Sequence, residues 1–359
     1  VTRMMCTPPS GARLISSSQD FGGGRFTDVT QHMPIMVPPK NGEPSITAYC
    51  ENDPNFLVRM GKGYGWYSTD NGINWAPMKS VPVEGQFIIS LDISAYPHKD
   101  TGNPVIYAVY GSTPPAVSFD LGNTWTISDA PPSKKKSEWD IVDLIATDKV
   151  NNEVVYYVNE GLLHRSEDYG VTYKAITSNG ECDSIKTMFG KKNYLFANWD
   201  GVLYYSSSQG ELFKKIEGPY DKVLKFAFGK EEKDGDPAVI YVMALKDGYY
   251  CVYRSQDIGQ TWTLIYNEST ETTTDMVALN SIAADRQLFG LVYLGSNGRG
   301  IHYGLPDDSN IFYKVRKDDV KVLINGQTVM FDVSPKLIDD RTMVPMRKIF
   351  EDVGAVVEW

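Results

Sequence analysis

Short apolar runs, separated by polar residues that favour turns, make up most of this chain. The runs are rich in β-branched and aromatic residues and have the length of strands; the clearest are 87–93, 105–110, 154–158, 194–197 and 238–245. No segment before residue 310 repeats its apolar positions with the 3.6-residue period of a helix. The pattern therefore predicts an all-β body over about residues 12–304.

A short motif, Ser-x-Asp-x-Gly-x-x-aromatic, recurs in this body at intervals of roughly 40 to 50 residues. We interpret it as the Asp-box. Its Ser and Asp oxygens can accept backbone N–H bonds in a tight turn, its Gly supplies a positive φ, and its aromatic side chain is expected to pack between strands. With about four strands per repeat, the spacing predicts a β-propeller. Five copies, the fourth without the Asp, begin at Ser68, Ser118, Ser166, Ser206 and Ser255.

The last part of the chain has a different character. Residues 305–313 are polar and rich in turn-forming residues, which predicts a linker after a propeller domain over 1–304. Over 314–359 the pattern predicts a small α+β module. It contains a hairpin centred on Asn-Gly at 325–326 and a short helix over 348–353.

Composition narrows the classes of partner. The net charge of −10 argues against nucleic acid and against anionic membrane surfaces, and it is compatible with a neutral polymer. No run of about 18 apolar residues is present, so no membrane span is predicted. The 7 Trp and 22 Tyr suit both the packing of blades and the binding of sugars.

The cysteines and histidines give no sign of a metal site. The four cysteines are widely separated, and we favour free thiols over disulfides because a large propeller does not need cross-links. The four histidines do not have the spacing of metal ligands, so no metal is predicted.

Both ends of the sequence look cut. The chain begins at Val1 without an initiator Met or a signal peptide, and it stops at Trp359 within a strand-like run. We therefore expect a fragment of a longer protein. The absence of a signal peptide then says little about the compartment.

One segment, Ser-Gln-Asp-Phe-Gly-Gly-Gly over 18–24, departs from the repeat. It lies about 50 residues before Ser68, so one interpretation is an ordinary Asp-box whose aromatic has moved to Phe26. Three consecutive glycines are more than one turn needs, and they would let a substrate or another backbone approach Asp20 closely. The alternative interpretation is therefore a functional Asp20.

The segment TPPSGARLISSSQDFGGGRFTD, residues 7–28, resembles a strongly patterned part of glycoside hydrolase family 74, the xyloglucanases. In that family Pro-Pro-(Ser/Thr)-Gly-Ala leads to a Gly-Asp-Ile-Gly-Gly core. The similarity continues through 67–70 and 227–229. It ends in LGSNGRGIHYG over 294–304, close to the family's Thr-Asn-Gly-Arg-Gly-Ile. The resemblance covers about residues 7–304.

This resemblance implies two seven-bladed propellers that face each other across a cleft and cleave the β-1,4-linked backbone of xyloglucan with inversion. Each propeller supplies one Asp, and the segment that supplies the general acid matches Asp20. The acid must hold a proton, so its pKa must be raised, while a second carboxylate activates water. This chain would then be all or part of the second propeller. The first propeller and its base would be missing, no cofactor is implied, and the fragment alone would be inactive.

Some residues depart from the family pattern. Gln19 stands where the family usually has Gly, Gly24 where it has Phe, and Phe26 where His is common. These changes fit either altered contacts with substrate or an inactive homologue.

Substrate contacts are expected from Gly22 and Gly23 beside Asp20 and from two Trp outside the Asp-boxes. Trp66 and Trp199 lie next to turns, where an aromatic face can stack on a sugar ring, and packing in the core is the alternative for both.

The C-terminal segment resembles the copper amine oxidase N-terminal-like domain through its Asn-Gly hairpin and the stretch RTMVPMR over 341–347. The domain is truncated at 359, and despite its name it implies no copper. Because the module occurs on secreted or wall-associated proteins of Gram-positive bacteria, the resemblance predicts an extracellular bacterial enzyme.

Two other functions remain open. A non-catalytic propeller that binds glycan or protein is favoured by the departures at 19, 24 and 26. A sialidase-like enzyme would need three clustered Arg and a Tyr nucleophile, whereas the arginines here mostly occur singly beside Asp-boxes.

Overall fold

The computed structural model describes most of the first 305 residues and short parts of the remainder. These residues fall into two compact units, Val1–Gly304 and Leu305–Trp359, which are considered separately. The described residues are 2–18, 22–31, 35–38, 45–134, 142–270, 279–297, 300–305, 323–324, 327–328, 336–338 and 341–343.

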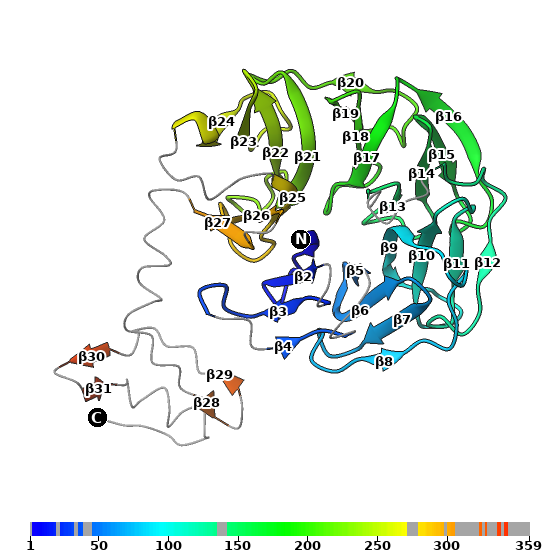
Figure 1. Ribbon diagram of the computed structural model, residues 1–359, viewed down its shortest axis with the longest axis horizontal. Helices are drawn as coiled ribbons and strands as arrows, with labels where there is room; N and C mark the ends of the chain where they lie inside the picture. The colour runs from blue at the N-terminus through cyan, green and yellow to red at the C-terminus, as the bar shows by residue number, and fades with distance from the viewer. Residues whose placement is uncertain are drawn as a thin grey trace. The chain divides into compact units, whose positions relative to one another are not determined.

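The first unit is a β-propeller of seven blades arranged around an axis (Figure 1). Within the part of the chain that the structure describes, six blades have four strands and the seventh has three. Each blade is an antiparallel sheet whose strands run in sequence order from the axis to the rim. The prediction of an all-β propeller is confirmed, and among the described residues the helical structure is one 3₁₀ turn, Glu268–Thr270. The first blade begins at Thr2, about ten residues before the strand-rich pattern recognised in the sequence from about residue 12.

The strands occupy four concentric positions. The innermost strands are β1 (Thr2–Cys6), β5 (Ser45–Cys50), β9 (Ile88–Pro97), β13 (Ile145–Thr147), β17 (Cys182–Thr187), β21 (Lys222–Gly229) and β25 (Leu279–Ala284). The second strands are β2 (Leu14–Ser18), β6 (Asp53–Gly61), β10 (Pro104–Tyr110), β14 (Val155–Asn159), β18 (Leu195–Trp199), β22 (Val239–Lys246) and β26 (Val292–Ser296). The third strands are β3 (Gly24–Phe26), β7 (Tyr64–Ser68), β11 (Ala116–Ser118), β15 (Leu162–Ser166), β19 (Val202–Ser206), β23 (Tyr249–Ser255) and β27 (Ile301–Gly304). The outermost strands are β4 (Ile35–Met36), β8 (Ala76–Pro77), β12 (Thr126–Ile127), β16 (Lys174–Ser178), β20 (Lys214–Lys215) and β24 (Thr263–Asn267).

The apolar runs of the sequence became inner and second strands. All seven residues of β10 are buried, as are the five of β18, because both surfaces of a blade pack against neighbouring blades. A strand covered on both sides is apolar throughout rather than alternating. The outermost strands are solvated, and both residues of β12 and of β20 are exposed.

The recurrent motif forms the turn between the third and fourth strands of blades two to six, and we call these the repeat turns. In the first copy the Gly72 N–H donates to Ser68 Oγ at 2.9 Å, and Ser68 donates to Asp70 at 2.8 Å. Asp70 also accepts the Asn74 N–H at 2.8 Å. In the fourth copy Ser208 takes the place of the Asp and accepts a backbone N–H from Leu212 at 3.1 Å.

In the described residues, the ring closes between blades seven and one without a strand common to both. Polar contacts from the segment between β1 and β2 join them instead: Thr7 Oγ1 donates to Ala284 O at 2.7 Å, and Arg13 pairs with Asp285 at 3.3 Å. Gln287 Nε2 donates to the carbonyls of Pro8 and Ala12, each at 3.0 Å. The Pro-Pro-Ser-Gly-Ala stretch therefore contributes to ring closure.

In the second unit, β28 (Leu323–Ile324) pairs antiparallel with β29 (Gln327–Thr328), which confirms the predicted hairpin. β30 (Lys336–Ile338) pairs with β31 (Arg341–Met343). The predicted helix over 348–353 lies outside the described residues.

All four cysteines carry thiols rather than forming disulfides, as predicted. In the described part of the chain, helical structure never reaches the length and apolarity that a membrane span requires.

Candidate functional site

The two faces of the propeller carry different turns. Since the strands of a blade alternate in direction, turns between the second and third strands lie on one face, which we call the glycine-turn face. The repeat turns lie on the opposite, repeat-turn face. Contacts between blades agree with this division: Trp199 Nε1 donates to Gly161 O at 3.1 Å on the glycine-turn face. On the repeat-turn face Asn71 Nδ2 donates to Ser10 O at 3.1 Å.

The segment with three glycines lies on the glycine-turn face. Ser18 ends β2 and Gly24 begins β3, so the segment joins the second and third strands of the first blade. Its interpretation as a further Asp-box is wrong, because the repeat turns join third and fourth strands at the opposite face. The agreement in spacing with Ser68 is coincidental. Gln19 and Asp20 themselves lie outside the described residues.

Gly22 and Gly23 are required by the packing of this turn against its own strand. Gly22 has φ +75°, and its carbonyl accepts the Ser18 N–H at 2.8 Å, which closes the turn. Gly23 has φ +153°, and a Cβ there would clash with the carbonyl oxygen of Ser16. Gly24 N–H donates to Ser16 Oγ at 3.1 Å. At Gly23 the backbone of β2 thus fills the space next to the glycine, while the predicted close approach to Asp20 lies outside the described residues.

The neighbouring seventh blade has a closely similar turn. Its Ser296 N–H donates to Gly300 O at 3.0 Å, and Gly300 has φ +80°. In blades two, four, five and six the corresponding turns have only two residues, and blade three has a different longer connection. The resemblance is most specific in two stretches, around Asp20 and over 294–304. These stretches therefore contain equivalent turns of adjacent blades. The two-residue turns end in Gly63, Gly161, Gly201 and Gly248.

A buried arginine supports the first of these turns from the second blade. Arg59 on β6 is 0% exposed, and its Nη2 donates to Gly22 O. Its Nη1 lies 3.0 Å from Ser17 Oγ, 2.9 Å from Thr47 Oγ1 and 3.4 Å from Ser16 O. Burial lowers the pKa of Arg59 to about 10, so the guanidinium is still charged at neutral pH. Sequence reasoning missed Arg59, although a lone cation in the apolar run 56–60 is a usable signal.

Trp66 lies on the same side of the second blade as Arg59. The two residues are directly opposite in the ladder between β6 and β7, and such residues project from the same surface of a sheet. Trp66 is half-buried. Arg59 is thus paired in the ladder with Trp66 and bonded to the turn at Gly22.

Trp199 is separated from this group. It lies in blade five, is 1% exposed, and packs edge-on against Phe213 with ring centroids 4.7 Å apart. Its indole N–H is bonded to a carbonyl of the preceding blade. Neither face of the ring is open to a sugar. Of the two interpretations given for Trp199, packing in the core is therefore the one that fits its surroundings.

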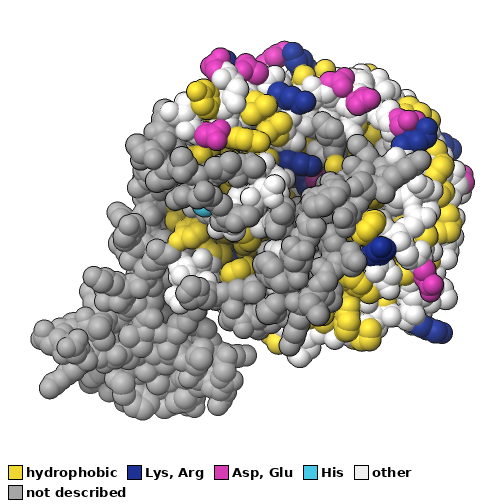
Figure 2. Space-filling model, viewed as in Figure 1, with side chains coloured by type: hydrophobic (Ala, Val, Ile, Leu, Met, Phe, Trp, Pro, Cys, Tyr) yellow, Lys and Arg dark blue, Asp and Glu magenta, His cyan; other side chains and the backbone are white. Residues whose placement is uncertain are grey.

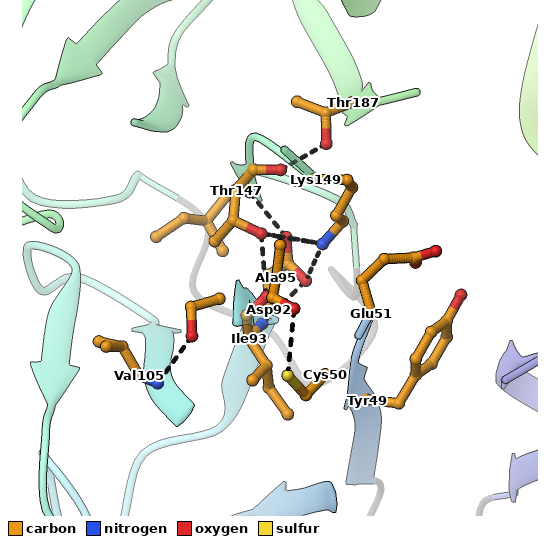
Figure 3. Close-up of polar contacts among 12 residues, drawn as sticks. Tyr49, Cys50, Glu51, Asp92, Ile93, Ala95, Val105, Thr147, Lys149 and Thr187 are labelled. Carbon is orange, nitrogen blue, oxygen red and sulfur yellow. Dashed lines mark hydrogen bonds and ion pairs between the residues drawn. The ribbon is translucent and has the colours of Figure 1, made fainter. Parts of the chain in front are cut away.

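The innermost strands surround an axial cavity of about 170 Å³. Three carboxylates and three cations are among its lining residues. Figure 3 shows one group, in which the Lys149 ammonium is bonded to the Asp92 carboxylate at 2.8 and 2.9 Å and to Thr147 Oγ1 at 2.9 Å. The other pairs are Lys186 with Asp143 at 2.7 Å and Arg286 with Glu51 at 3.0 Å.

These pairs connect different blades. Arg286 follows β25 in blade seven, Glu51 follows β5 in blade two, and the guanidinium lies over the Phe189 ring of blade five at 3.2 Å from its centroid. Each lining carboxylate has a cation partner, so the cavity offers no unpaired charge among its described lining residues. We assign it to ring packing and place the candidate site on the glycine-turn face.

The described surface has mixed charge. In Figure 2 acidic and basic side chains are interspersed around the rim of the propeller rather than gathered by sign. This distribution suits a neutral ligand better than a polyanion.

Comparison with known proteins agrees with these motifs. A xyloglucanase of Paenibacillus is 27% identical over 85% of this chain and 30% of its own length. A xyloglucanase of Acetivibrio thermocellus is 28% identical over 84% of this chain and 35% of its own length. The chain thus spans about a third of the length of these curated relatives.

Solved structures show the same fold. A family GH74 enzyme of Niastella koreensis superposes with a TM-score of 0.72 at 21% identity, covering 86% of this chain and 43% of that one. Residues 307–359 match the family described as the copper amine oxidase N-terminal domain. The chain is therefore similar over most of its length to part of the xyloglucanases of glycoside hydrolase family 74, and similar at its C-terminal end to the copper amine oxidase N-terminal domain.

Proposed function

We propose that this chain is part of a glycoside hydrolase that cleaves the β-1,4-linked backbone of xyloglucan, and that Asp20 is its general acid. The observation that carries the proposal is the similarity to xyloglucanases over 84–85% of the chain. The two extended turns on the glycine-turn face support it, since they contain the stretches that resemble the family most.

The chemistry needs two carboxyl groups. In an inverting glycosidase one protonated carboxyl gives its proton to the leaving oxygen, while a carboxylate roughly 6.5–9.5 Å away activates water on the opposite side of the sugar. Asp20 would act as the acid. The base would come from a second propeller of the same parent polypeptide, so residues 1–359 alone would not turn over. Proton transfer between carboxyls and water requires no cofactor.

Substrate would lie across the glycine-turn face. Trp66 is the aromatic candidate for stacking on a sugar ring, because it is only half-buried and is paired in the ladder with Arg59, which binds the turn at Gly22. Gly22 and Gly23 would act indirectly by fixing that turn. A polymer substrate implies an extracellular enzyme, and we propose that the C-terminal unit is an appended module outside the chemistry.

The test uses the longest natural polypeptide that contains this sequence. It is incubated with xyloglucan, with unsubstituted β-1,4-glucan and with a β-1,3-glucan, and reducing ends are measured. We expect release from xyloglucan in preference to the other two, with inverted anomeric configuration in the first products observed by NMR.

If neither β-1,4-linked polymer is cleaved, the proposal fails. Binding of xyloglucan without cleavage would then support a non-catalytic propeller. In that case the departures at Gln19, Gly24 and Phe26 would mark the loss of activity.

A further inference from the structure

We propose that Arg59 is a positioning residue for the turn that carries Asp20, so that a side chain of the second blade sets the geometry of the acid in the first. The inference rests on the proposed function, since Asp20 is taken as the general acid. Arg59 does not itself contact the reacting atoms.

The contacts of the guanidinium bracket Asp20 in the chain. Nη1 reaches Ser16 O and Ser17 Oγ on β2, before Asp20, and Nη2 reaches Gly22 O, after it. Nη1 also reaches Thr47 on β5, which ties the group to the second blade. A planar fork of five donors can hold several acceptors in fixed directions, as a flexible ammonium cannot. One side chain therefore holds both stems of the turn.

The described contacts of Arg59 explain how it can hold the turn. Its acceptors belong to two blades: Ser16, Ser17 and Gly22 lie on the stems of the turn, and Thr47 lies on β5. Burying a polar group is costly unless it is hydrogen-bonded, so these bonds fix the guanidinium and the turn relative to each other.

A second buried arginine joins the same two blades at the other face and serves as the matched control. Arg25 on β3 donates from Nε to Asn71 O at 2.7 Å and from Nη2 to Asn71 Oδ1 at 3.0 Å. Burial lowers the pKa of Arg25, and the nearby Asp70 carboxylate offsets part of that effect. Arg25 thus resembles Arg59 in burial and in linking blades, but its bonds go to a repeat turn.

Three variants are compared with the wild type in the longest natural polypeptide: Arg59→Met, Arg59→Lys and Arg25→Met. Values of kcat and KM are measured on xyloglucan, and stability is measured by urea unfolding. Because a misplacement of about 1 Å at a reacting group can cost about 10²-fold, Arg59→Met should lower kcat by about 10- to 100-fold with KM within about twofold. Arg59→Lys should recover part of the loss, and Arg25→Met should keep kcat within about threefold at a comparable loss of stability.

Amide hydrogen exchange provides a readout that does not depend on activity. In Arg59→Met the amides of Ser18 and Gly24, which are bonded within the turn, should exchange about tenfold faster or more. The amides of Gly72 and Asn74 in the repeat turn should be unchanged, and Arg25→Met should show the reverse pattern.

The inference is overturned if Arg59→Met keeps kcat within about threefold of wild type, if Arg25→Met loses as much kcat, or if exchange at Ser18 and Gly24 is unaltered. If the wild type cleaves no glucan, the proposed function fails, but this result does not decide the role of Arg59. The exchange measurement then decides by itself whether Arg59 holds the turn.

Discussion

Gly23 shows how little freedom the turn on the glycine-turn face has at the scale of single residues. Its φ of +153° is a conformation that residues with a Cβ rarely adopt, and the Ser16 carbonyl occupies the space that a Cβ would fill. Gly22 closes the turn through its carbonyl, and Arg59 binds that carbonyl from the adjacent blade. The chain after Asp20 thus contains a position, Gly23, that a residue with a Cβ could not occupy without a clash.

Gly23→Ala should destabilise the protein by about 2–3 kcal/mol, because it combines a strained backbone with a clash against another backbone. Gly102→Ala is the control, since Gly102 has φ +70° but open space around it. Urea unfolding measures both variants. If the cost at Gly23 did not exceed the cost at Gly102, the close packing of the turn against β2 would be disproved.

At the scale of elements, the repeat turns are the best-defined local structures of the chain. In the last copy Asp257 accepts bonds from the backbone and side chain of Thr261 at 2.8 and 2.6 Å and from Ser255 at 2.8 Å. Slight burial alone would raise the pKa of Asp257, but these hydrogen bonds outweigh it and lower the pKa. The same holds for Asp70, Asp120 and Asp168.

Because their pKa is lower in the folded state than in the unfolded state, these carboxylates stabilise the fold at any pH above the unfolded-state pKa of about 3.9. This stabilisation is lost as the pH falls through the folded-state pKa. Asp257→Asn should therefore cost about 1 kcal/mol at pH 7 and progressively less below about pH 4. The urea midpoint at pH 7 and at pH 3 measures the difference.

The control for this pH dependence is Ser208→Ala, which removes the equivalent bond to Leu212 without removing a charge. Its cost should be the same at both pH values. Equal costs for Asp257→Asn at pH 7 and pH 3 would contradict the assigned role of the carboxylates.

Sequence reasoning worked best where structure is set by near neighbours. The repeat turns and the strands at 105–110 and 238–245 were predictable, because their bonds and burial follow from adjacent residues. It was not predictable that the segment at 18–24 joins the second and third strands of its blade. The spacing between motifs does not show how many strands of a blade precede a given turn. The role of Arg59 and the burial of Trp199 depend on contacts between blades, which no local pattern encodes.

At the scale of the whole molecule, a buried acid is one of the groups that join the two blades at the seam of the ring. Asp285 has a fully buried side chain and accepts bonds from the Gln287 and Leu288 N–H groups and from the Tyr293 hydroxyl, each at 2.7 Å. It also pairs with Arg13 of the first blade at 3.3 Å. Among the described strands none is common to both blades, and these contacts and the packing of β1 against β25 join the two sides of the seam.

Asp285→Ala should cost about 3–5 kcal/mol, the range for breaking a buried, hydrogen-bonded ion pair. Glu217→Ala, which removes an exposed partner of Lys215, should change stability by less than about 1 kcal/mol. Chemical unfolding, followed with one probe at each interface between blades, would measure the stability of both variants. A cost at Asp285 no larger than that at Glu217 would show that the seam is closed by other means.

The most direct test of the proposed chemistry is the dependence of Asp20→Asn on the leaving group, in the longest natural polypeptide that contains this sequence. The value of kcat/KM is measured on xyloglucan and on an aryl glycoside of a xyloglucan oligosaccharide whose phenol leaves without a proton. Asp70→Asn, an aspartate of a repeat turn, is the matched control and should keep both activities. If Asp20 is the general acid, Asp20→Asn should lose about 10²- to 10⁴-fold on xyloglucan and far less on the aryl glycoside. Full activity on xyloglucan, or equal losses on both substrates, would contradict that role.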